Sequence, residues 1–121
     1  MAKFSYLEAI HQAQDLALEK YHNTFILGED VGKKGGVFGT TQGLQEKYGL
    51  ERVIDTPLAE SNIIGTAIGA AMLNKRPIAE IQFADFILPA TNQIISEAAK
   101  MRYRSNNDWS CPLTIRAPYG G

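Results

Sequence analysis

Four short apolar runs alternate with stretches of helical pattern along this 121-residue chain. The runs lie at residues 24–30, 52–57, 76–83 and 112–118. Apolar runs this short, bounded by glycine, proline or charged residues, are typical of strands that are buried on both faces. Strands that alternate with helices form a mainly parallel sheet, because each parallel connection needs a crossover. We therefore predict an α/β domain in which helices flank a mainly parallel sheet.

The helical stretches carry their own signals. Ser5 and Glu8 form a capping box, and behind them apolar residues recur at three- and four-residue spacing to about Tyr21. Pro89 suits the first turn of a late helix, where its missing N–H has no partner to lose. Beyond the first helix, three further helices are expected over residues 43–48, 61–73 and 89–105.

The composition argues against several classes of partner and site. A formal net charge of −1 disfavours nucleic acid or an anionic membrane as the main partner, since both require a basic surface. Cys111 is the single cysteine, so no intramolecular disulfide can form, and we expect a buried thiol rather than a nucleophile. No apolar run approaches the ~18 residues of a membrane span, and the first residues lack a secretory signal. The sequence therefore predicts a soluble intracellular protein.

Two stretches leave questions open. The glycine-rich segment at residues 31–43 contains neither nucleotide-binding fingerprint, so we expect only a mobile or ligand-contacting loop there. After the last predicted strand, the sequence reaches Gly121 without a helix to cover the sheet. Because both faces of a parallel sheet need cover, we expect part of a longer chain, or a core completed by a partner.

Glu60 is an acid that enters an otherwise apolar helix. One interpretation is structural, because an acid in the first helical turn gains about 0.3–1 kcal/mol from the helix dipole. The other is catalytic, because carboxylates in apolar settings commonly donate or accept protons. The residues by themselves leave both interpretations open. The apolar side of this helix comprises Ile63, Ile64, Ala67, Ile68, Ala71 and Met72.

Ser61, Gly65 and Gly69 form a second stripe on the same helix, at four-residue spacing. Each glycine inside a helix costs about 0.5–1 kcal/mol relative to alanine. Two glycines on one stripe indicate a backbone that approaches another helix or a ligand closely. Tight packing inside a buried helix is the simpler explanation, and the two explanations are compatible.

Four separated motifs resemble one known family. They are LGEDVGKKGGVF, DTPLAES, AEIQFADF and RYRSNNDWSCPLTIRAPYGG. In this order they resemble the β subunit of thiamine-diphosphate-dependent 2-oxo acid dehydrogenases, the E1 components of the pyruvate and branched-chain complexes. The resemblance covers essentially the whole chain. IQFADF followed by RYRSNNDW is more similar to the branched-chain members, so the resemblance implies the N-terminal portion of such a subunit, a pyrimidine-binding domain over residues 1–121.

The resemblance implies a catalytic role for Glu60. It matches the glutamate of the family's TP-x-x-E motif, which hydrogen-bonds to ring nitrogen N1′ of the aminopyrimidine of thiamine diphosphate and promotes deprotonation of the thiazolium ring. The resemblance also implies that Phe86 packs on the aminopyrimidine and that Leu58 contacts the same ring. It places Gln82 along the active site and, as a weaker candidate, Glu29 near the cofactor.

The resemblance further implies metals and partners. In the family a GDG motif of the α subunit holds magnesium and the diphosphate, and no GDG occurs here, so an E1 α subunit in an α2β2 heterotetramer is expected. Leu113 matches a position whose backbone carbonyl helps to bind potassium in some members. The other expected partners are a 2-oxo acid and the E2 lipoyl acyltransferase. The expected location is the bacterial cytoplasm, or the mitochondrial matrix for a mature eukaryotic chain.

The family's β-subunit histidine would lie beyond Gly121, because neither His11 nor His22 stands in a matching motif. The 121-residue chain is therefore expected to be inactive alone. Two alternatives stay open. One keeps the fold and changes the substrate to pyruvate or acetoin, and the other is a non-catalytic α/β binding or scaffold module in which Glu60 only stabilises its helix.

Overall fold

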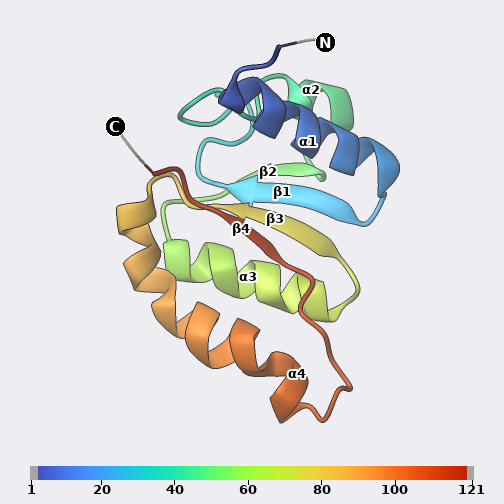
Figure 1. Ribbon diagram of the computed structural model, residues 1–121, viewed down its shortest axis with the longest axis vertical. Helices are drawn as coiled ribbons and strands as arrows, with labels where there is room; N and C mark the ends of the chain where they lie inside the picture. Colours follow the sequence, from blue (N-terminus) through green and yellow to red (C-terminus); the bar gives the residue numbers. More distant parts are fainter. Residues whose placement is uncertain (1–2, 120–121) are drawn as a thin grey trace.

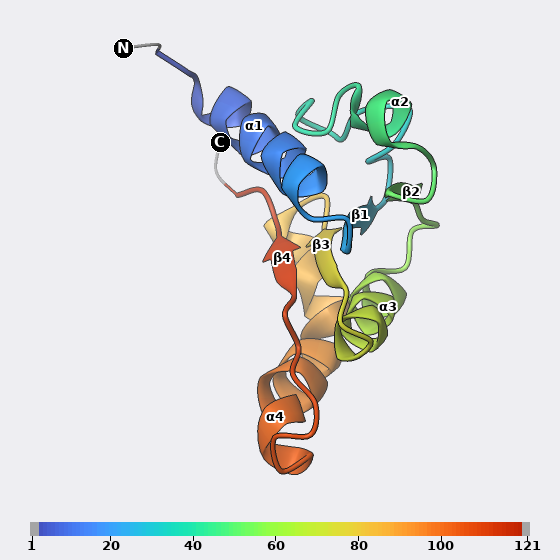
Figure 2. The ribbon, with the colours of Figure 1, turned by 90° about the vertical axis from the view of Figure 1, so that its right-hand side faces the viewer.

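The computed structural model describes residues 3–119, which fold into three layers (Figure 1). Helices α1 (Tyr6–Lys20) and α2 (Leu44–Tyr48) lie on one face of a central sheet. Helix α3 (Glu60–Met72) and the helical segment that ends with α4 (Met101–Arg104) lie on the other face. Figure 2 shows the same three layers from the side. The predicted α/β class, with helices flanking a parallel sheet, is confirmed.

The sheet has four parallel strands in the order β2–β1–β3–β4. Ile26 of β1 pairs with Val53 of β2 on one side and with Ile78 of β3 on the other, while Glu80 of β3 pairs with Arg116 of β4. Because every pairing is parallel, the carboxyl ends of the strands meet at one edge, which we call the carboxyl edge. The strands are β1 (Thr24–Gly28), β2 (Val53–Asp55), β3 (Arg76–Glu80) and β4 (Thr114–Arg116).

Helix α1 begins at the predicted capping box. The Ser5 hydroxyl accepts a hydrogen bond from the Glu8 amide at 3.2 Å, and the Glu8 carboxylate accepts one from the Ser5 amide at 2.7 Å. This carboxylate therefore has a lowered pKa, chiefly because the Ser5 backbone amide donates to it. In its last turn, α1 packs Leu18 into a hydrophobic cluster against the sheet. The cluster comprises Leu18, Ile26, Val31, Leu44 and Val53.

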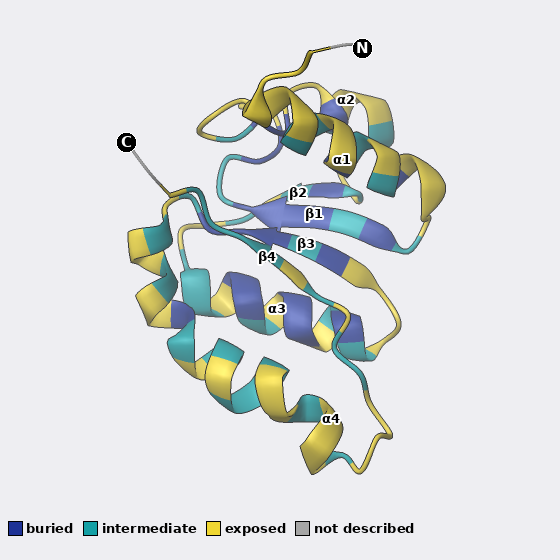
Figure 3. Cartoon of the chain, viewed as in Figure 1, coloured by how far each residue is buried: buried dark blue, intermediate teal, exposed yellow. Residues whose placement is uncertain are grey.

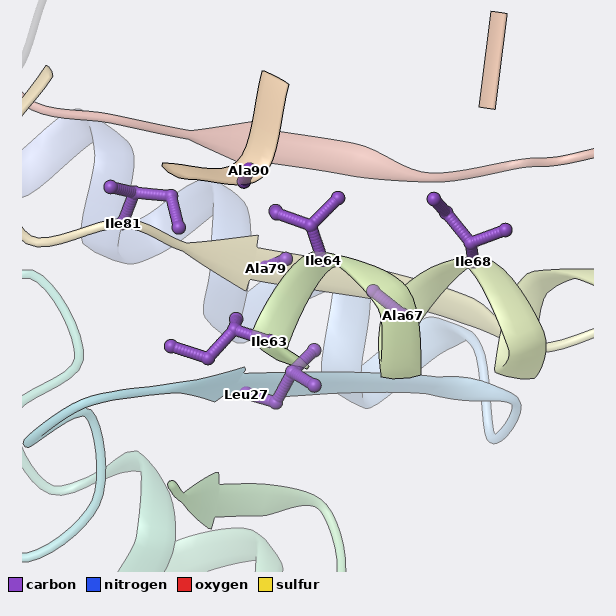
Figure 4. Packing of buried hydrophobic residues seen from close by; sticks show 8 residues of the cluster. All are labelled: Leu27, Ile63, Ile64, Ala67, Ile68, Ala79, Ile81 and Ala90. Atoms are coloured by element: carbon purple, nitrogen blue, oxygen red, sulfur yellow. The ribbon is translucent and has the colours of Figure 1, made fainter. Parts of the chain in front are cut away.

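Helix α3 supplies the second hydrophobic cluster, on the opposite face of the sheet. Its predicted apolar side is buried there except for Met72, which is partly buried, and Figure 3 shows buried residues recurring along α3. A fully buried aliphatic side chain contributes about 1.5–3 kcal/mol, so this face dominates the packing of the lower layer. Within residues 3–119, no helix has both the length and the apolar character needed to cross a membrane. The cluster comprises Leu27, Ile63, Ile64, Ala67, Ile68, Ala79, Ile81 and Ala90 (Figure 4).

The prediction of one regular helix over residues 89–105 is wrong in both start and form. The helical segment begins five residues earlier, as the 3-10 helix η1 (Ala84–Ala90), and Pro89 lies inside it rather than in a first turn. A proline has no N–H for the helical ladder and its ring crowds the preceding turn, which disfavours a regular α-helix there. The segment then changes form twice before α4, through the π-helix η2 (Gln93–Glu97) and the 3-10 turn η3 (Ala98–Lys100).

The glycine-rich segment between β1 and α2 folds back on itself at the carboxyl edge. Gly35 and Gly36 have φ of 78° and Gly39 has φ of 72°, a backbone conformation that favours glycine. The Gly36 amide donates to the Asp30 carbonyl at 2.8 Å, and the Thr41 amide donates to the Gly35 carbonyl at 3.0 Å. The segment is therefore a hydrogen-bonded loop with short-range turns of its own.

Candidate functional site

The chain leaves β1 and β3 toward opposite faces of the sheet. The loop after β1 leads to α2 on one face, whereas the residues after β3 lead to η1 on the face of α3 (Figure 1). In open parallel sheets, ligands bind at the carboxyl edge where neighbouring connections diverge in this way. Glu29 and Gln82 follow these two strand ends. The topology therefore points to a site at the carboxyl ends of β1 and β3.

Glu60 is the first residue of α3 and is half-buried. The preceding N-cap residue, Ala59, provides no side-chain cap, so Glu60 is the acidic group of this helical turn. Unpaired amides of a first turn carry partial positive charge, which stabilises a nearby carboxylate by about 0.3–1 kcal/mol. Within residues 3–119, the carboxylate takes part in neither a hydrogen bond nor a salt bridge. It is held at the carboxyl edge with its accepting oxygens uncommitted.

Leu58 and Phe86 present apolar surface at the same edge. The Leu58 side chain, in the short connection from β2 to α3, is 69% exposed, and Phe86 in η1 is 47% exposed. Phe86 also contacts Phe83 edge-to-face, with ring centroids 5.8 Å apart. Exposed rings and branched aliphatic side chains near an uncommitted carboxylate suit a flat aromatic ligand that carries a polar nitrogen.

Gln82 bridges the ends of β3 and β1. Its side-chain amide donates to the Asp30 carboxylate at 3.4 Å, and Asp30 has a positive φ of 59° in the turn after β1. The adjacent Glu29 is half-buried in this turn. The structure therefore brings both predicted residues to the edge that also carries Leu58, Glu60 and Phe86.

Leu113 does not belong to this group. It precedes β4, and in a parallel sheet that position lies at the amino edge, opposite the carboxyl edge. The Leu113 amide donates to the Cys111 carbonyl at 2.8 Å, and both side chains pack against the α3 cluster. Burial raises the pKa of the half-buried Cys111 thiol, which fits a packing role.

A buried ion pair at the carboxyl edge was not predicted from the sequence. Glu80, at the end of β3, is 1% exposed, and Arg116 donates to its Oε2 from Nη2 at 2.7 Å and from Nε at 3.2 Å. Arg116 Nη2 also donates to the Thr40 hydroxyl in the glycine-rich loop at 2.7 Å. The sequence did contain a signal for this pair, because Glu80 and Arg116 occupy similar places in two consecutive apolar runs. Charged residues in buried strands usually pair with an opposite charge, so the two residues could have been expected to meet.

The small-residue stripe of α3 faces away from the sheet. A Cβ built at Gly69 meets no atom within 4 Å, and one built at Gly65 meets only Gln93 Cγ at 3.9 Å, among the residues described. Close packing inside the described part of the chain therefore does not account for Gly69. The groove beside the stripe measures about 490 Å³ and is lined in part by Met101 and Trp109.

These features define the chain as a parallel α/β domain with a candidate ligand site at the carboxyl edge. Residues 2–121 match the family described as "transketolase, pyrimidine binding domain", and the chain belongs to this family. The chain is 66% identical over 121 residues to 2-oxoisovalerate dehydrogenase subunit beta of Bacillus subtilis. The aligned region covers all of this chain and 37% of the relative. The resemblance inferred from the four motifs is confirmed.

Two further relatives frame this similarity. The 2-oxoisovalerate dehydrogenase subunit beta of Pseudomonas aeruginosa is 50% identical over 115 residues, or 95% of this chain and 33% of the relative. The pyruvate dehydrogenase E1 component subunit beta of Bacillus subtilis is 46% identical over 121 residues, or all of this chain and 37% of the relative. The chain thus spans about a third of the length of the curated relatives it matches.

Proposed function

We propose that this chain forms the aminopyrimidine-holding part of the β subunit of a thiamine-diphosphate-dependent 2-oxo acid dehydrogenase that acts on branched-chain 2-oxo acids. The observation that carries the proposal is the uncommitted, half-buried carboxylate of Glu60 at the start of α3. In this proposal, residues 1–121 are the N-terminal, pyrimidine-binding domain of a longer subunit.

The residues at the carboxyl edge fit the aminopyrimidine of thiamine diphosphate. That ring needs a carboxylate for a protonated ring nitrogen and apolar surface for its faces. Glu60 supplies a carboxylate acceptor to which no residue of the described chain donates a hydrogen bond. Leu58 and Phe86 supply exposed apolar surface. When bound, thiamine diphosphate supplies the electron sink for decarboxylation of the 2-oxo acid.

Each residue then has a defined task. Glu60 accepts a hydrogen bond from ring nitrogen N1′ and so holds the proton on that atom, at a place where the helix N-terminus favours its negative charge. Phe86 and Leu58 orient the ring and exclude water from its faces. Gln82 lines the site from the end of β3, and Glu29 lies near the cofactor at the end of β1.

The proposal assigns the other parts of the reaction to partners. An E1 α subunit supplies the diphosphate and magnesium site, and two copies of each subunit form the heterotetramer. An E2 acyltransferase receives the acyl group on its lipoyl arm. Leu113 offers its backbone carbonyl to potassium at the amino edge, apart from the cofactor ring. The enzyme works in the bacterial cytoplasm, or in the mitochondrial matrix of a eukaryote, and the isolated chain is inactive.

The substrate assignment rests on comparing this chain with two relatives that both come from Bacillus subtilis. The chain is 66% identical to the 2-oxoisovalerate dehydrogenase β subunit of Bacillus subtilis and 46% identical to its pyruvate dehydrogenase β subunit, over the same 121 residues. This difference favours branched-chain 2-oxo acids. Pyruvate or acetoin is the second candidate, because the 46% identity also covers the whole chain.

The direct test uses a chimera in which residues 1–121 replace the matched segment of the Bacillus subtilis 2-oxoisovalerate dehydrogenase β subunit, copurified with that enzyme's α subunit. Turnover of 3-methyl-2-oxobutanoate and of pyruvate is measured with and without added thiamine diphosphate. We expect cofactor-dependent turnover with preference for the branched substrate.

Each outcome of this assay has a consequence for the proposal. A preference for pyruvate would keep the mechanism and move the substrate assignment to the second candidate. A well-assembled chimera without any cofactor-dependent turnover would favour the non-catalytic module. The parental Bacillus subtilis enzyme, assayed beside the chimera, controls for the assay itself.

The stripe on α3 yields a prediction about assembly. In this proposal, the stripe packs closely against the α subunit. Gly69→Leu is therefore expected to weaken association with the α subunit by roughly five- to hundredfold, because overpacking that contact costs about 1–3 kcal/mol. The folding of the domain itself should change little, since the position is open in the described chain. Sedimentation velocity of the coexpressed subunits measures the association.

The matched control for Gly69→Leu is Thr66→Leu, at an exposed position of the same helix. Thr66→Leu should leave assembly unchanged. Equal losses of assembly and of thermal stability in Gly69→Leu would contradict the prediction and favour core packing of the stripe.

A further inference from the structure

Three phenylalanine rings form a continuous row along the carboxyl edge. Phe38 and Phe83 contact each other edge-to-face, with centroids 5.9 Å apart and planes at 75°. Phe83 and Phe86 repeat this geometry at 5.8 Å and 84°. Each ring is partly exposed, at 43%, 37% and 47% in chain order. The phenylalanine row therefore connects the glycine-rich loop to the ring that faces the proposed cofactor.

The loop end of the row is fixed from several elements. Phe38 lies between Gly36 and Gly39, both of which have positive φ. Gly39 is followed by Thr40, which is 1% exposed. The Thr40 hydroxyl accepts from Arg116 at 2.7 Å, which ties the loop to the paired ends of β3 and β4. The Thr40 carbonyl accepts from the Gln14 side chain of α1 at 2.9 Å. His11 Nδ1 lies 3.1 Å from the same carbonyl oxygen.

The other end of the row is fixed by a turn. The Phe86 amide donates to the Phe83 carbonyl at 2.9 Å, and the Ala84 amide donates to the Pro118 carbonyl at 2.9 Å. These bonds hold the backbone of Phe83 and Phe86. They leave the partly exposed rings themselves to be oriented by side-chain contacts. An edge-to-face contact favours the ring orientation in which it forms by about 0.5–1.5 kcal/mol, so contact with Phe83 favours the observed orientation of Phe86.

We propose that Phe83 and Phe38 are positioning residues that hold the Phe86 ring in its cofactor-binding orientation and so couple the glycine-rich loop to the cofactor site. This inference rests on the proposed function, in which Phe86 packs on the aminopyrimidine. Phe83 acts on Phe86 directly, and Phe38 acts through Phe83. The Glu80–Arg116–Thr40 contacts hold the loop from which Phe38 extends.

The first test measures the affinity of the assembled chimera for thiamine diphosphate, in excess magnesium, by isothermal titration calorimetry. Phe83→Leu and Phe38→Leu are each expected to weaken binding by about two- to tenfold, the range that corresponds to loss of one aromatic pair. Phe83→Tyr keeps an aromatic ring at this partly exposed position, so this variant should bind thiamine diphosphate like the parent. Phe4→Leu replaces a phenylalanine of similar exposure outside the row and should also bind like the parent.

The second test needs no cofactor. Hydrogen exchange measured by mass spectrometry on the same assemblies should show faster exchange at residues 84–88 in Phe38→Leu, although the substitution lies in the loop. Phe4→Leu should leave this segment unchanged. Unchanged exchange and unchanged affinity in both leucine variants would overturn the inference, as would a Phe83→Tyr variant as weak as Phe83→Leu.

Different outcomes would contradict the proposed function and the positioning role of Phe83 and Phe38. If the parent chimera does not bind thiamine diphosphate, the proposed function fails, and with it the cofactor role of the row. If the parent binds and Phe86→Leu weakens binding while Phe83→Leu and Phe38→Leu do not, only the positioning role fails. Thermal unfolding of each variant identifies a loss of binding that comes from misfolding, and the Phe83→Tyr comparison then decides.

Discussion

Glu60→Gln is expected to reduce thiamine-diphosphate-dependent turnover of the assembled chimera by about 10²- to 10⁴-fold, the usual contribution of a group that holds or transfers a proton. The substitution keeps the size of the side chain and removes its negative charge. A neutral amide cannot stabilise the protonated ring nitrogen as a carboxylate does. Turnover of 3-methyl-2-oxobutanoate, measured at saturating cofactor, shows the effect.

The assembly should survive this substitution. Glu60 is half-buried and makes neither hydrogen bond nor salt bridge within residues 3–119, so its replacement costs only its interaction with the helix N-terminus. Sedimentation velocity and thermal unfolding check that α and β remain associated and folded.

Glu46→Gln is the matched control, because Glu46 is also an acid in the first turn of a helix. If helix stabilisation were the whole role of Glu60, the two variants would behave alike. Full activity in Glu60→Gln would mean that this acid only stabilises α3, and the catalytic proposal would be wrong.

Arg116→Met is expected to destabilise the 121-residue chain by about 3–5 kcal/mol, which is a large fraction of the stability of a small domain. The substitution leaves the Glu80 carboxylate in a site that is 1% exposed, without its guanidinium partner. It also removes the donor to the Thr40 hydroxyl. Urea unfolding, followed by far-UV circular dichroism, measures the loss.

Two comparisons test the cause of that loss. The double variant Glu80→Met, Arg116→Met should recover most of the stability, because it removes the buried charge together with its partner. Arg104→Met breaks the exposed pair with Glu97, which is joined at 3.1 Å, and should cost only about 0.2–1 kcal/mol. A double variant as unstable as Arg116→Met alone would show that volume and shape, rather than the unpaired charge, set the cost.

Local signals predicted much of this fold. The Ser5–Glu8 capping box depends on residues three apart, and it forms as predicted. The apolar side of α3 follows from helical spacing, and it builds the larger core cluster. The alternation of strands and helices predicts the parallel sheet, because a parallel connection requires a crossover. The four motifs likewise led to the family that matches residues 2–121.

Other features depend on which strands become neighbours in the folded sheet, and local sequence patterns do not specify that pairing. Glu80 and Arg116 are 36 residues apart and meet because β3 and β4 pair in that register. The same topology separates Leu113, at the amino edge, from the candidates at the carboxyl edge. The mixed 3-10 and π geometry after Ala84 also escaped local reasoning, since it reflects Pro89 together with packing against α3.

The candidate site likewise contains one residue that the local sequence predicts and others that come together only in the folded chain. The motif containing Glu60 can be read from sequence, because the junction between a strand and a helix is local. The row formed by Phe38, Phe83 and Phe86 cannot, because Phe38 comes from a loop that folds back on its glycines and reaches η1 across the carboxyl edge. Local sequence patterns therefore predict most helices and strands and the position of Glu60, because these depend on residues close together in the chain. The long-range pairing of strands sets which residues surround Glu60, because it joins segments far apart in the chain.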